Sequence, residues 1–361
     1  MKTANFFVDC HVFDGNLQGT TTHLKGLYQE LIKDKNNNFF LAAHDIDNLK
    51  LVFGIHENVI YIKYSSKNKL YRLLIDIPKL IQQNKIDYAH FQYIVPPIKK
   101  CKYIVTIHDV LFLDYPIYFP LLYRIKNKVL FKYSAKKSEY VLTVSEYSKE
   151  KIEKHFNISN VKIIPNAIDS VFFEKFEKKK EIQIVKTKFN LENYFLFVSR
   201  WEPRKNHHNL LKTYVENKYF KKYKLVFVGD DAINNKAYNE YYRLLDDEIK
   251  ANIIRLKKIN YSDLIHLVRA ASLSVYPSFA EGFGIPPLES IASCVPTICS
   301  NTTAMSDFDF IGDCLFDPSS PIDMNNKIQT ALSDNFIKDK QRQVNLKYKW
   351  ELSANFFKEI F

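Results

Sequence analysis

The sequence predicts an α/β protein built from two Rossmann-like domains, each a doubly wound parallel sheet, that face a central cleft. The 361 residues exceed what one hydrophobic core usually organises. Apolar runs of strand length alternate with spacers of helix length in both halves of the chain. With 46% apolar and 25% charged residues, the composition is that of a globular protein with a sizeable core.

In the first half, strand-like runs are separated by longer segments in which apolar residues recur with a helical period. This alternation indicates β-α-β units, and such units build parallel sheets with helices on both faces. The predicted strands cover residues 6–13, 59–64, 86–93, 103–109 and 140–145.

The second half repeats the same alternation, with predicted strands at residues 194–199, 224–229, 252–256, 273–277, 297–300 and 313–316. Residues 162–189 form the predicted seam between the halves, because the segment IIPNAID is followed by a charged stretch without glycine. Ligands of open α/β sheets bind beyond the carboxyl ends of the strands. Residues that directly follow a strand are therefore the first candidates for a site.

The start of the chain and its cysteines bear on location and on metal binding. Asp9 and Asp14 interrupt the first segment, which lacks the apolar centre of a signal peptide, so we predict a cytoplasmic protein. No apolar run reaches the roughly 18 residues that a spanning helix needs. The five cysteines are odd in number and lack C-x-x-C pairing, which argues against disulfides and zinc. We predict no metal site.

Lysine and arginine exceed aspartate and glutamate by 52 minus 40, a net charge of +12 that favours an anionic partner, unless the excess is spread over a solvated surface. Residues 118–137 hold six basic residues, no acidic ones and interleaved apolar side chains. Such a stretch fits an anionic membrane face. It equally fits a surface helix whose apolar stripe faces its own domain, and the sequence leaves both interpretations open.

A loop that bears two glycines precedes a predicted helix at residues 277–293, PSFAEGFGIPPLESIAS. Free backbone N–H groups around Phe283, Gly284 and Ile285, together with the helix dipole, suit a diphosphate. Glu281 and Glu289 can border the same ligand, because a carboxylate accepts pairs of sugar or ribose hydroxyls.

A second segment, VSRWEPRKNHHNL at residues 198–210, places Arg200 and Lys205 beside the same cleft. Two fixed cations can neutralise a leaving diphosphate. Taken alone, two cations five positions apart are usually surface charge. The glutamate loop at residues 277–293 is what favours a functional role for Arg200 and Lys205.

The turn at residues 200–205 and EGFGIPPLE at residues 281–289 resemble the GT4 family of retaining glycosyltransferases, which have the GT-B fold. Further segments match that family in order and spacing over nearly the full length of the chain. They are VTIHD at 105–109, LTVSEYS at 142–148, IIPNAID at 163–169, LVFVGD at 225–230 and VPTICSNTTAMS at 295–306.

The resemblance implies a role for each candidate residue. Arg200 and Lys205 would hold the donor diphosphate, and Glu289 would bind the nucleotide ribose. Glu281, with the backbone of residues 283–285, would bind the transferred sugar. In the first half, Gly19 would let the first loop approach the phosphates, and His108 would position the hydroxyls of the transferred sugar. A histidine after a buried strand is otherwise more often a hydrogen-bonded packing residue.

The resemblance also implies the domains and the reaction. Residues 1–168 would form the acceptor-side domain, joined by a returning C-terminal helix at about 344–361, and residues 169–343 the nucleotide-sugar-binding domain. We predict a metal-independent hexosyltransferase without a cofactor, retaining through an oxocarbenium-like transition state in which the departing diphosphate takes the acceptor proton. Double displacement through Glu281 is the mechanistic alternative.

The opening FDGNLQGTTTHLKGLYQEL at residues 13–31 looks like GT4 mannosyltransferases of bacterial surface-polysaccharide and lipopolysaccharide assembly. This makes GDP-mannose the favoured donor and a glycan, free or polyprenyl-linked, the acceptor. The basic stretch at 118–137 would then contact the inner face of the plasma membrane as a peripheral surface. A GT-B sugar-nucleotide epimerase, a non-catalytic donor-binding subunit and a basic nucleic-acid-binding protein are the alternatives. We expect no nucleic-acid partner, because the glutamate loop does not serve one.

Overall fold

The computed structural model describes residues 3–15, 19–333 and 337–361. The chain divides into two compact units, Met1–Ala167 with Trp350–Phe361, and Ile168–Lys349. The returning segment thus begins at Trp350, whereas the sequence placed its start at about 344. The difference arises because Val344 is fully buried within a helix, Ile337–Lys347, that packs inside the second unit.

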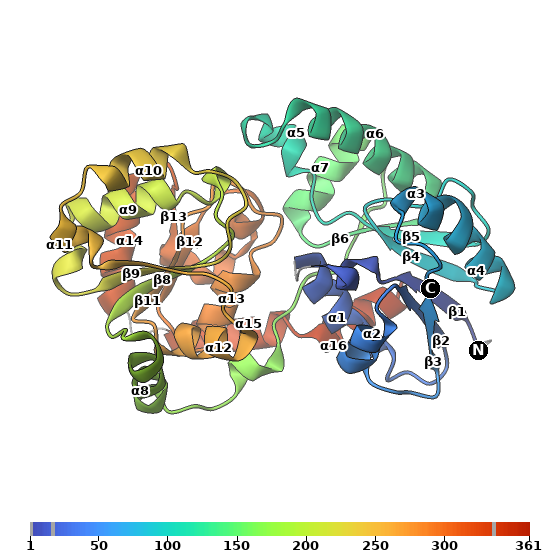
Figure 1. Cartoon of the computed structure of the whole chain (residues 1–361), viewed down its shortest axis with the longest axis horizontal. Helices are drawn as coiled ribbons and strands as arrows, with labels where there is room; N and C mark the ends of the chain where they lie inside the picture. The colour runs from blue at the N-terminus through green and yellow to red at the C-terminus, as the bar shows by residue number, and fades with distance from the viewer. Residues whose placement is uncertain (1–2, 16–18, 334–336) are drawn as a thin grey trace. The chain divides into compact units, whose positions relative to one another are not determined.

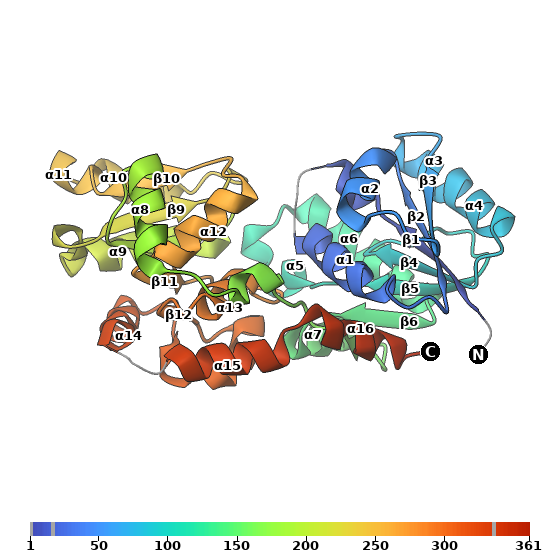
Figure 2. The ribbon, with the colours of Figure 1, turned by 90° about the horizontal axis from the view of Figure 1, so that it is seen from below.

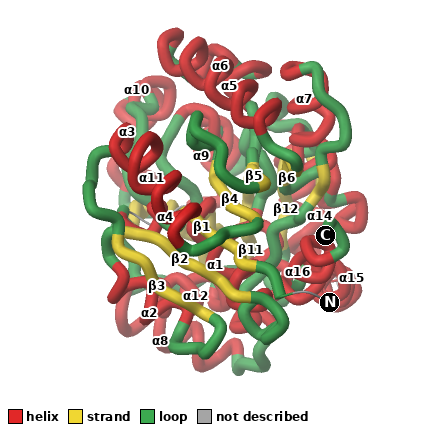
Figure 3. The backbone as a smooth tube through the Cα atoms, turned by 90° about the vertical axis from the view of Figure 1, so that its right-hand side faces the viewer, coloured by secondary structure: helices red, strands yellow, loops and turns green. Residues whose placement is uncertain are grey.

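The described residues of the first unit form a seven-stranded sheet of order β3-β2-β1-β4-β5-β6-β7, and all neighbouring strands are parallel. Strands β1, β2 and β3 can be followed side by side in Figure 3. The strands are β1 (Asn5–Asp9), β2 (Asn38–Ala43), β3 (Val59–Lys63), β4 (Tyr88–Gln92), β5 (Lys102–Thr106), β6 (Tyr140–Thr143) and β7 (Lys162–Ile163).

Two strands of this unit, β2 and β7, were not predicted, and the first predicted strand was too long. The sequence interpretation missed β2, because its run NFFLAA is a short apolar segment buried on both faces, which periodicity cannot distinguish from part of a helix. The predicted strand at 6–13 ends at Asp9 and gives way to a 3-10 helix, His11–Asp14. The carboxylate of Asp9 accepts a hydrogen bond from the His11 backbone N–H at 3.3 Å, which supports the turn out of the strand.

Helices cover both faces of this sheet (Figure 1). The side chains of β1 alternate, so that Phe6 and Val8 join one core and Phe7 the other. The first core includes α1 (Gly19–Leu31), α2 (Ile46–Phe53) and α16 (Trp350–Lys358). The second lies under a π-helix (Arg72–Asp76), α4 (Ile77–Gln83), α5 (Leu111–Asp114), α6 (Leu121–Lys137) and α7 (Glu146–Phe156). Two short elements, α3 (Lys69–Tyr71) and a 3-10 helix (Pro116–Tyr118), bury none of their residues.

The described part of the second unit forms a six-stranded parallel sheet of order β10-β9-β8-β11-β12-β13. Its central strand β8 reads YFLFV and is almost entirely buried, as expected for a parallel strand covered on both faces. The strands are β8 (Tyr194–Val198), β9 (Lys224–Val228), β10 (Ile253–Leu256), β11 (Leu273–Tyr276), β12 (Thr297–Ser300) and β13 (Leu315–Phe316). Two parallel-sheet domains, as predicted, are therefore confirmed.

The helices of the second unit pack in pairs, α8 on α12, α9 on α14 and α10, and α13 on α15. They are α8 (Lys178–Phe189), α9 (His207–Glu216), α10 (Lys236–Arg243), α11 (Asp247–Lys250), α12 (Tyr261–Ala270), α13 (Ile285–Ala292), α14 (Pro321–Ser333) and α15 (Ile337–Lys347). Shorter 3-10 helices lie at Ser170–Phe173, Pro203–Lys205, Tyr219–Lys221, Thr303–Asp307 and Asp309–Cys314.

One glycine allows the C-terminal helix to pack on the first unit. Helix α16 lies against α1 (Figure 2), and the indole of Trp350 covers Gly26. A Cβ atom added to Gly26 would lie 2.0 Å from Cε2 of Trp350, well inside van der Waals contact. Close packing of this kind leaves no room for even one methyl group.

We therefore expect Gly26→Ala to destabilise the first unit by about 2 kcal/mol, because overpacking outweighs the gain in helix propensity. Thermal unfolding followed by circular dichroism measures the change. Gly19→Ala in the same helix is the control, because no atom lies within 4 Å of its added Cβ. Gly26→Ala combined with Trp350→Leu should recover part of the loss, and an unchanged midpoint in Gly26→Ala would contradict the packing argument.

Candidate functional site

The amino terminus of α13 presents backbone donors. Gly284 caps the helix with φ at 104°, in a region that other residues rarely adopt, and Pro286 and Pro287 carry no N–H. Within the described part of the chain, no hydrogen bond uses the backbone N–H of Phe283, Gly284 or Ile285. Such donors, together with the helix dipole, form a site suited to an anion.

The side chain of Phe283 is not available to a ligand. It is buried and packs edge-on against Phe308 and Tyr348, with ring centroids 6.0 and 5.8 Å away. A Cβ atom at Gly284 would meet Cγ of Met305 at 3.0 Å. The loop is thus held in place by its packing, so only its backbone is available to a ligand.

Glu281 is held by three donors. Its carboxylate accepts hydrogen bonds from Lys205 Nζ at 2.5 Å, from Ser278 Oγ at 2.8 Å and from Arg204 Nη1 at 3.3 Å. Burial alone raises the pKa of Glu281, but the positive charges of Lys205 and Arg204 outweigh it and lower the pKa to about 2. Burial lowers the pKa of Lys205 against the opposing effect of the Glu281 carboxylate. The pair is a partly buried ion pair.

Arg204 belongs to this cluster, although the sequence interpretation did not select it. Its guanidinium also bonds the backbone oxygen of Ala280 and lies 2.6 Å from Glu202. Arg204 and Lys205 end the same 3-10 turn, Pro203–Lys205, which points both cations at Glu281. The adjacent basic residues Arg204 and Lys205 are the feature of the sequence that could have identified Arg204.

Arg200 lies apart from the ion-pair cluster. It follows β8, its side chain is exposed, and it makes no hydrogen bond or ion pair with another residue that the structure describes. The two cations that meet at Glu281 are therefore Arg204 and Lys205, whereas the binding of a diphosphate by Arg200 with Lys205 stays a prediction.

Glu289, one turn into α13, has the opposite environment to Glu281. Its carboxyl group makes no hydrogen bond or ion pair within the described residues. Burial and then the negative charge of Asp169 raise the pKa of Glu289 to about 8. Asp169 and Glu289 also raise the pKa of Tyr261, after burial, so the three groups lie close together. The sequence interpretation named neither Asp169 nor Tyr261 for this place.

In the first unit, His108 follows β5 and is buried. Its Nε2–H donates to Oε1 of Gln92 at 2.7 Å, which leaves Nδ1 as an acceptor. Burial, and then the charges of His23 and His90, lower the pKa of His108 well below its ordinary value. His108 is therefore a neutral imidazole near pH 7 with one defined tautomer.

The network behind His108 is longer. Gln92 Nε2 lies 3.3 Å from Nε2 of His90, which also bonds Thr106 at 2.8 Å, and Nδ1 of His90 lies 2.7 Å from the hydroxyl of Tyr28. All of these side chains are buried. Gln92 is the last residue of β4 and lies beside the end of β5. Because ligands of open α/β sheets bind beyond the carboxyl ends of the strands, this position could have identified Gln92 from the sequence.

Gly19 is the first residue of α1, and nothing lies within 4 Å of a Cβ built on it. The loop before it, residues 16–18, lies outside the described residues, so its predicted approach to phosphates is not described. The selected residues thus fall into two groups, Gly19 and His108 in the first unit and the others in the second.

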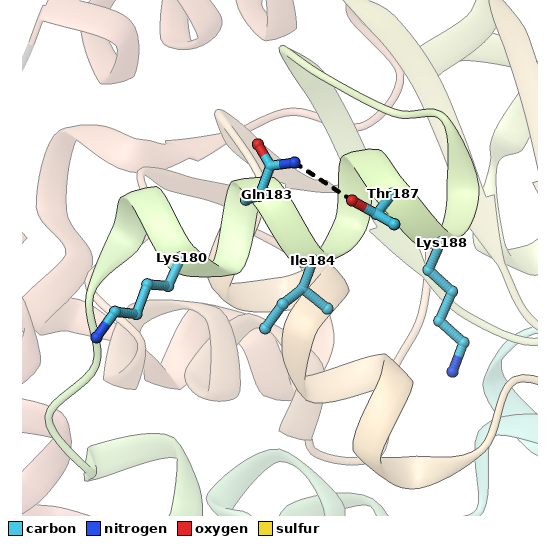
Figure 4. A pocket seen from close by; sticks show the side chains of 5 residues that line it. All are labelled: Lys180, Gln183, Ile184, Thr187 and Lys188. Atoms are coloured by element: carbon cyan, nitrogen blue, oxygen red, sulfur yellow. Dashed lines mark hydrogen bonds between the residues drawn. The ribbon is translucent and has the colours of Figure 1, made fainter.

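Metal binding and surface pockets are the two other features of the described residues that bear on a site. No group of three His, Cys, Asp or Glu side chains in the described part could hold a metal ion. Figure 4 shows a surface pocket on one side of α8, lined by Lys180, Gln183, Ile184, Thr187 and Lys188. Its one internal hydrogen bond joins Gln183 to Thr187 at 3.3 Å, and it includes none of the selected site residues.

Sequence comparison places known families over both units. Residues 17–172 match the family described as Glycosyltransferase Family 4, and residues 178–350 match Glycosyl transferases group 1. The chain is 33% identical to the O-antigen chain mannosyltransferase RfbU of Salmonella typhimurium over 199 residues, 55% of this chain and 51% of that protein. It is 28% identical to the O-antigen chain mannosyltransferase B of Escherichia coli over 331 residues, 81% and 84% of the two chains.

Solved structures show the same fold. The chain superposes on Anabaena HepE in complex with UDP and glucose with a TM-score of 0.76 at 16% identity, covering 99% of both chains. Sucrose-phosphate synthase from Thermosynechococcus elongatus has the same TM-score and identity, with 99% and 98% covered. Together with the two parallel sheets, these neighbours show the predicted GT-B fold.

The two glutamates should respond to pH in opposite ways. A carboxyl group whose pKa is raised from 4.5 to about 8 stabilises the fold below pH 4.5 and loses that contribution as pH rises through 8. Glu289→Gln should therefore raise stability by about 2 kcal/mol at pH 9 and change little at pH 4. Urea unfolding of the two proteins across this range measures the difference.

Glu281→Gln is the matched control. Because its pKa is lowered, Glu281 contributes stability above pH 4.5 that is lost as pH falls through about 2. Removing its charge leaves Lys205 and Arg204 without a counter-charge, and we expect a loss of about 3 kcal/mol at pH 7. Equal effects of the two substitutions at pH 9 would contradict this account.

Proposed function

We propose that this chain, which belongs to the GT4 family of glycosyltransferases, transfers mannose from GDP-mannose to a glycan acceptor in the synthesis of a surface polysaccharide. The names of the two O-antigen mannosyltransferases support mannose. The observation that carries the proposal is the amino terminus of α13, where free N–H groups stand between an ion-paired glutamate and one without a partner.

The donor would occupy the second unit in three contacts. Its diphosphate would accept hydrogen bonds from the backbone of residues 283–285 and from Lys205, and the exposed Arg200 would join Lys205 in neutralising its charge. The ribose hydroxyls donate to Glu289, which gives that carboxyl the partners it lacks. Glu281 accepts from the hydroxyls of the transferred sugar.

The reaction is proposed to retain the configuration of the anomeric carbon and to need no metal or cofactor. The bond between that carbon and the diphosphate oxygen breaks, the acceptor oxygen bonds the carbon on the same face, and the departing diphosphate takes the acceptor proton. Double displacement through Glu281 is disfavoured, because both of its oxygens already accept hydrogen bonds from cations. Nδ1 of the neutral His108 would accept a hydrogen bond from a hydroxyl of the transferred sugar.

The acceptor is proposed to be a glycan on a polyprenyl carrier, which would bring the enzyme to the inner face of the plasma membrane. Two alternatives share the fold. A sugar-nucleotide epimerase would release an altered free sugar without acceptor, and a silent subunit would bind donor fully without turnover.

Calorimetric titration with UDP, GDP, ADP and their sugar derivatives, in chelator, tests the donor site. We expect GDP-mannose to bind in the micromolar range, and Lys205→Ala and Glu289→Ala each to weaken binding roughly 10- to 100-fold. Lys218→Ala, on an exposed turn of the same unit, is the control and should bind like wild type. Failure of every sugar nucleotide to bind, or unchanged affinity in both site variants, would remove the donor-site assignment.

The network behind His108 gives a second test. Gln92→Leu removes the acceptor that fixes the imidazole, and we expect kcat to fall roughly tenfold while the affinity for GDP-mannose stays constant. Gln92→Glu keeps an acceptor and adds a charge that raises the pKa of His108, so activity should return with a shifted pH profile. Equal loss of donor affinity in both variants would indicate a structural role for Gln92 instead.

A further inference from the structure

Strand β3 is an open edge of the first unit's sheet. It pairs with β2 on one side, and no strand of the described residues lies on its other side (Figure 3). The backbone oxygen of Asn58 and the N–H of Tyr64 both bond to β2. Because successive residues of a strand direct their backbone groups to opposite sides, Tyr61 and Lys63 present theirs outward. Within the described residues, the outward groups of Tyr61 and Lys63 make no hydrogen bond.

Of the edge strands in the two described sheets, β3 is the least protected. Natural proteins keep edge strands short or place charges on them, because an open edge pairs readily with another chain. Strands β7 and β13 have two residues each, and β10 carries the charge of Arg255 within its four residues. Strand β3 has five residues, VIYIK, and its only charged residue is the last. This edge therefore has the length and composition to accept a further strand.

Exposed apolar side chains surround the same edge. Ile60 of β3 is 45% exposed, Leu51 of α2 is 87% exposed, and Ile55, in the connection from α2 to β3, is 88% exposed. Helix α2 packs on β3, so these side chains border one edge. None of the helices in the described residues has the length and apolarity to cross a membrane. Apolar side chains around an open strand indicate a protein partner.

Opposite charges stand at the two ends of β3. Glu57 lies in the turn that leads into the strand, Lys63 is its last residue, and both side chains are exposed. Neither makes an ion pair with another described residue. A twofold axis between two antiparallel copies of the strand brings each end beside the opposite end. The edge is therefore complementary in charge to a second copy of itself.

We propose that the chain forms a dimer in which β3 pairs antiparallel with β3 of a second copy. With the twofold axis at Tyr61, the Tyr61 N–H donates to the Tyr61 oxygen of the second copy, and the Lys63 N–H donates to the Val59 oxygen. The N–H of Val59 already donates to the oxygen of His56, so this register uses the outward donors that remain. The dimer goes beyond the proposed transfer reaction and does not depend on it.

The side chains fit the same register. Ile60 lies opposite Ile62 of the second copy, where two apolar side chains cover one another. Lys63 lies diagonally across from Glu57 of the second copy, at a distance that long side chains span. Both contacts occur on each side of the axis, so each favourable pair counts once for either copy.

Sedimentation equilibrium of the full chain over a range of concentrations tests the dimer. We expect a Kd in the micromolar range, because one short strand buries a small interface. Ile60→Lys should weaken the dimer roughly 30-fold, since it replaces an apolar pair by charges of one sign beside the axis. Ile322→Lys in α14 of the second unit is the matched control, because Ile322 is 76% exposed and should leave the Kd unchanged.

Exchange of the two charges tests the antiparallel register itself. Glu57→Lys alone or Lys63→Glu alone places like charges at both ends of the pairing, and each should weaken its own dimer roughly tenfold. An equimolar mixture of these two variants should form a mixed dimer with the affinity of the wild type, because every pair again joins opposite charges. Energy transfer between a donor dye on one variant and an acceptor dye on the other measures the mixed dimer. Recovery in the mixture also verifies that both variants fold.

Three outcomes would overturn the proposal. The first is a wild-type chain that stays monomeric up to roughly 200 μM, a concentration at which a micromolar interface is formed. The second is a dimer that Ile60→Lys and its control Ile322→Lys affect equally. The third is a mixture of the two charge variants that associates no better than either variant alone. The residues assigned to sugar transfer lie outside β3, so sugar-nucleotide binding and turnover test the proposed function separately.

Discussion

The buried charge of Glu281 is the constraint around which the second unit's site is arranged. A carboxylate removed from water is costly unless cations and hydrogen bonds surround it, and Lys205, Arg204 and Ser278 do so. The same contacts tie distant loops together, since Arg204 also bonds the Ala280 oxygen and the Glu281 N–H donates to Thr303. The loop before α13 is thereby fixed, and its N–H groups stay free for a ligand.

The carboxyl group of Glu289 has no cation or hydrogen-bond donor beside it among the described residues, so it does not stabilise the fold as Glu281 does. A carboxyl group with a pKa near 8, beside Asp169 and without a hydrogen-bond partner among the described residues, weakens the free protein at neutral and alkaline pH. Sites that bind ligands commonly carry a cost of this kind, because the missing partners arrive with the ligand. In the proposed donor site, the fixed Glu281 and the uncompensated Glu289 would therefore act in different ways.

The sequence predicted the parallel sheets and most strands, because runs such as YFLFV are apolar throughout and bounded by polar turns. It missed β2, whose six residues carry no period, and it could not orient α6, whose apolar residues occupy both faces. Glu281 and Lys205 were selected from motifs and do meet. Arg204, Gln92 and Asp169 were not selected. Their contacts with Glu281, His108 and Glu289 join residues that are distant in sequence, and no local sequence pattern indicates such contacts.

Sheet topology explains why residues so far apart in sequence meet. In the second unit β8 and β11 are neighbours, and the chain leaves them toward opposite edges, β9 and β10 on one side and β12 and β13 on the other. The loops after two such strands part and leave room beyond their carboxyl ends. Lys205 follows β8 and Glu281 follows β11, so their contact arises at this point. In the first unit β1 and β4 part in the same way, and Gln92 closes β4 beside the strand that leads to His108. Each sheet thus gathers its polar groups where its strand order reverses.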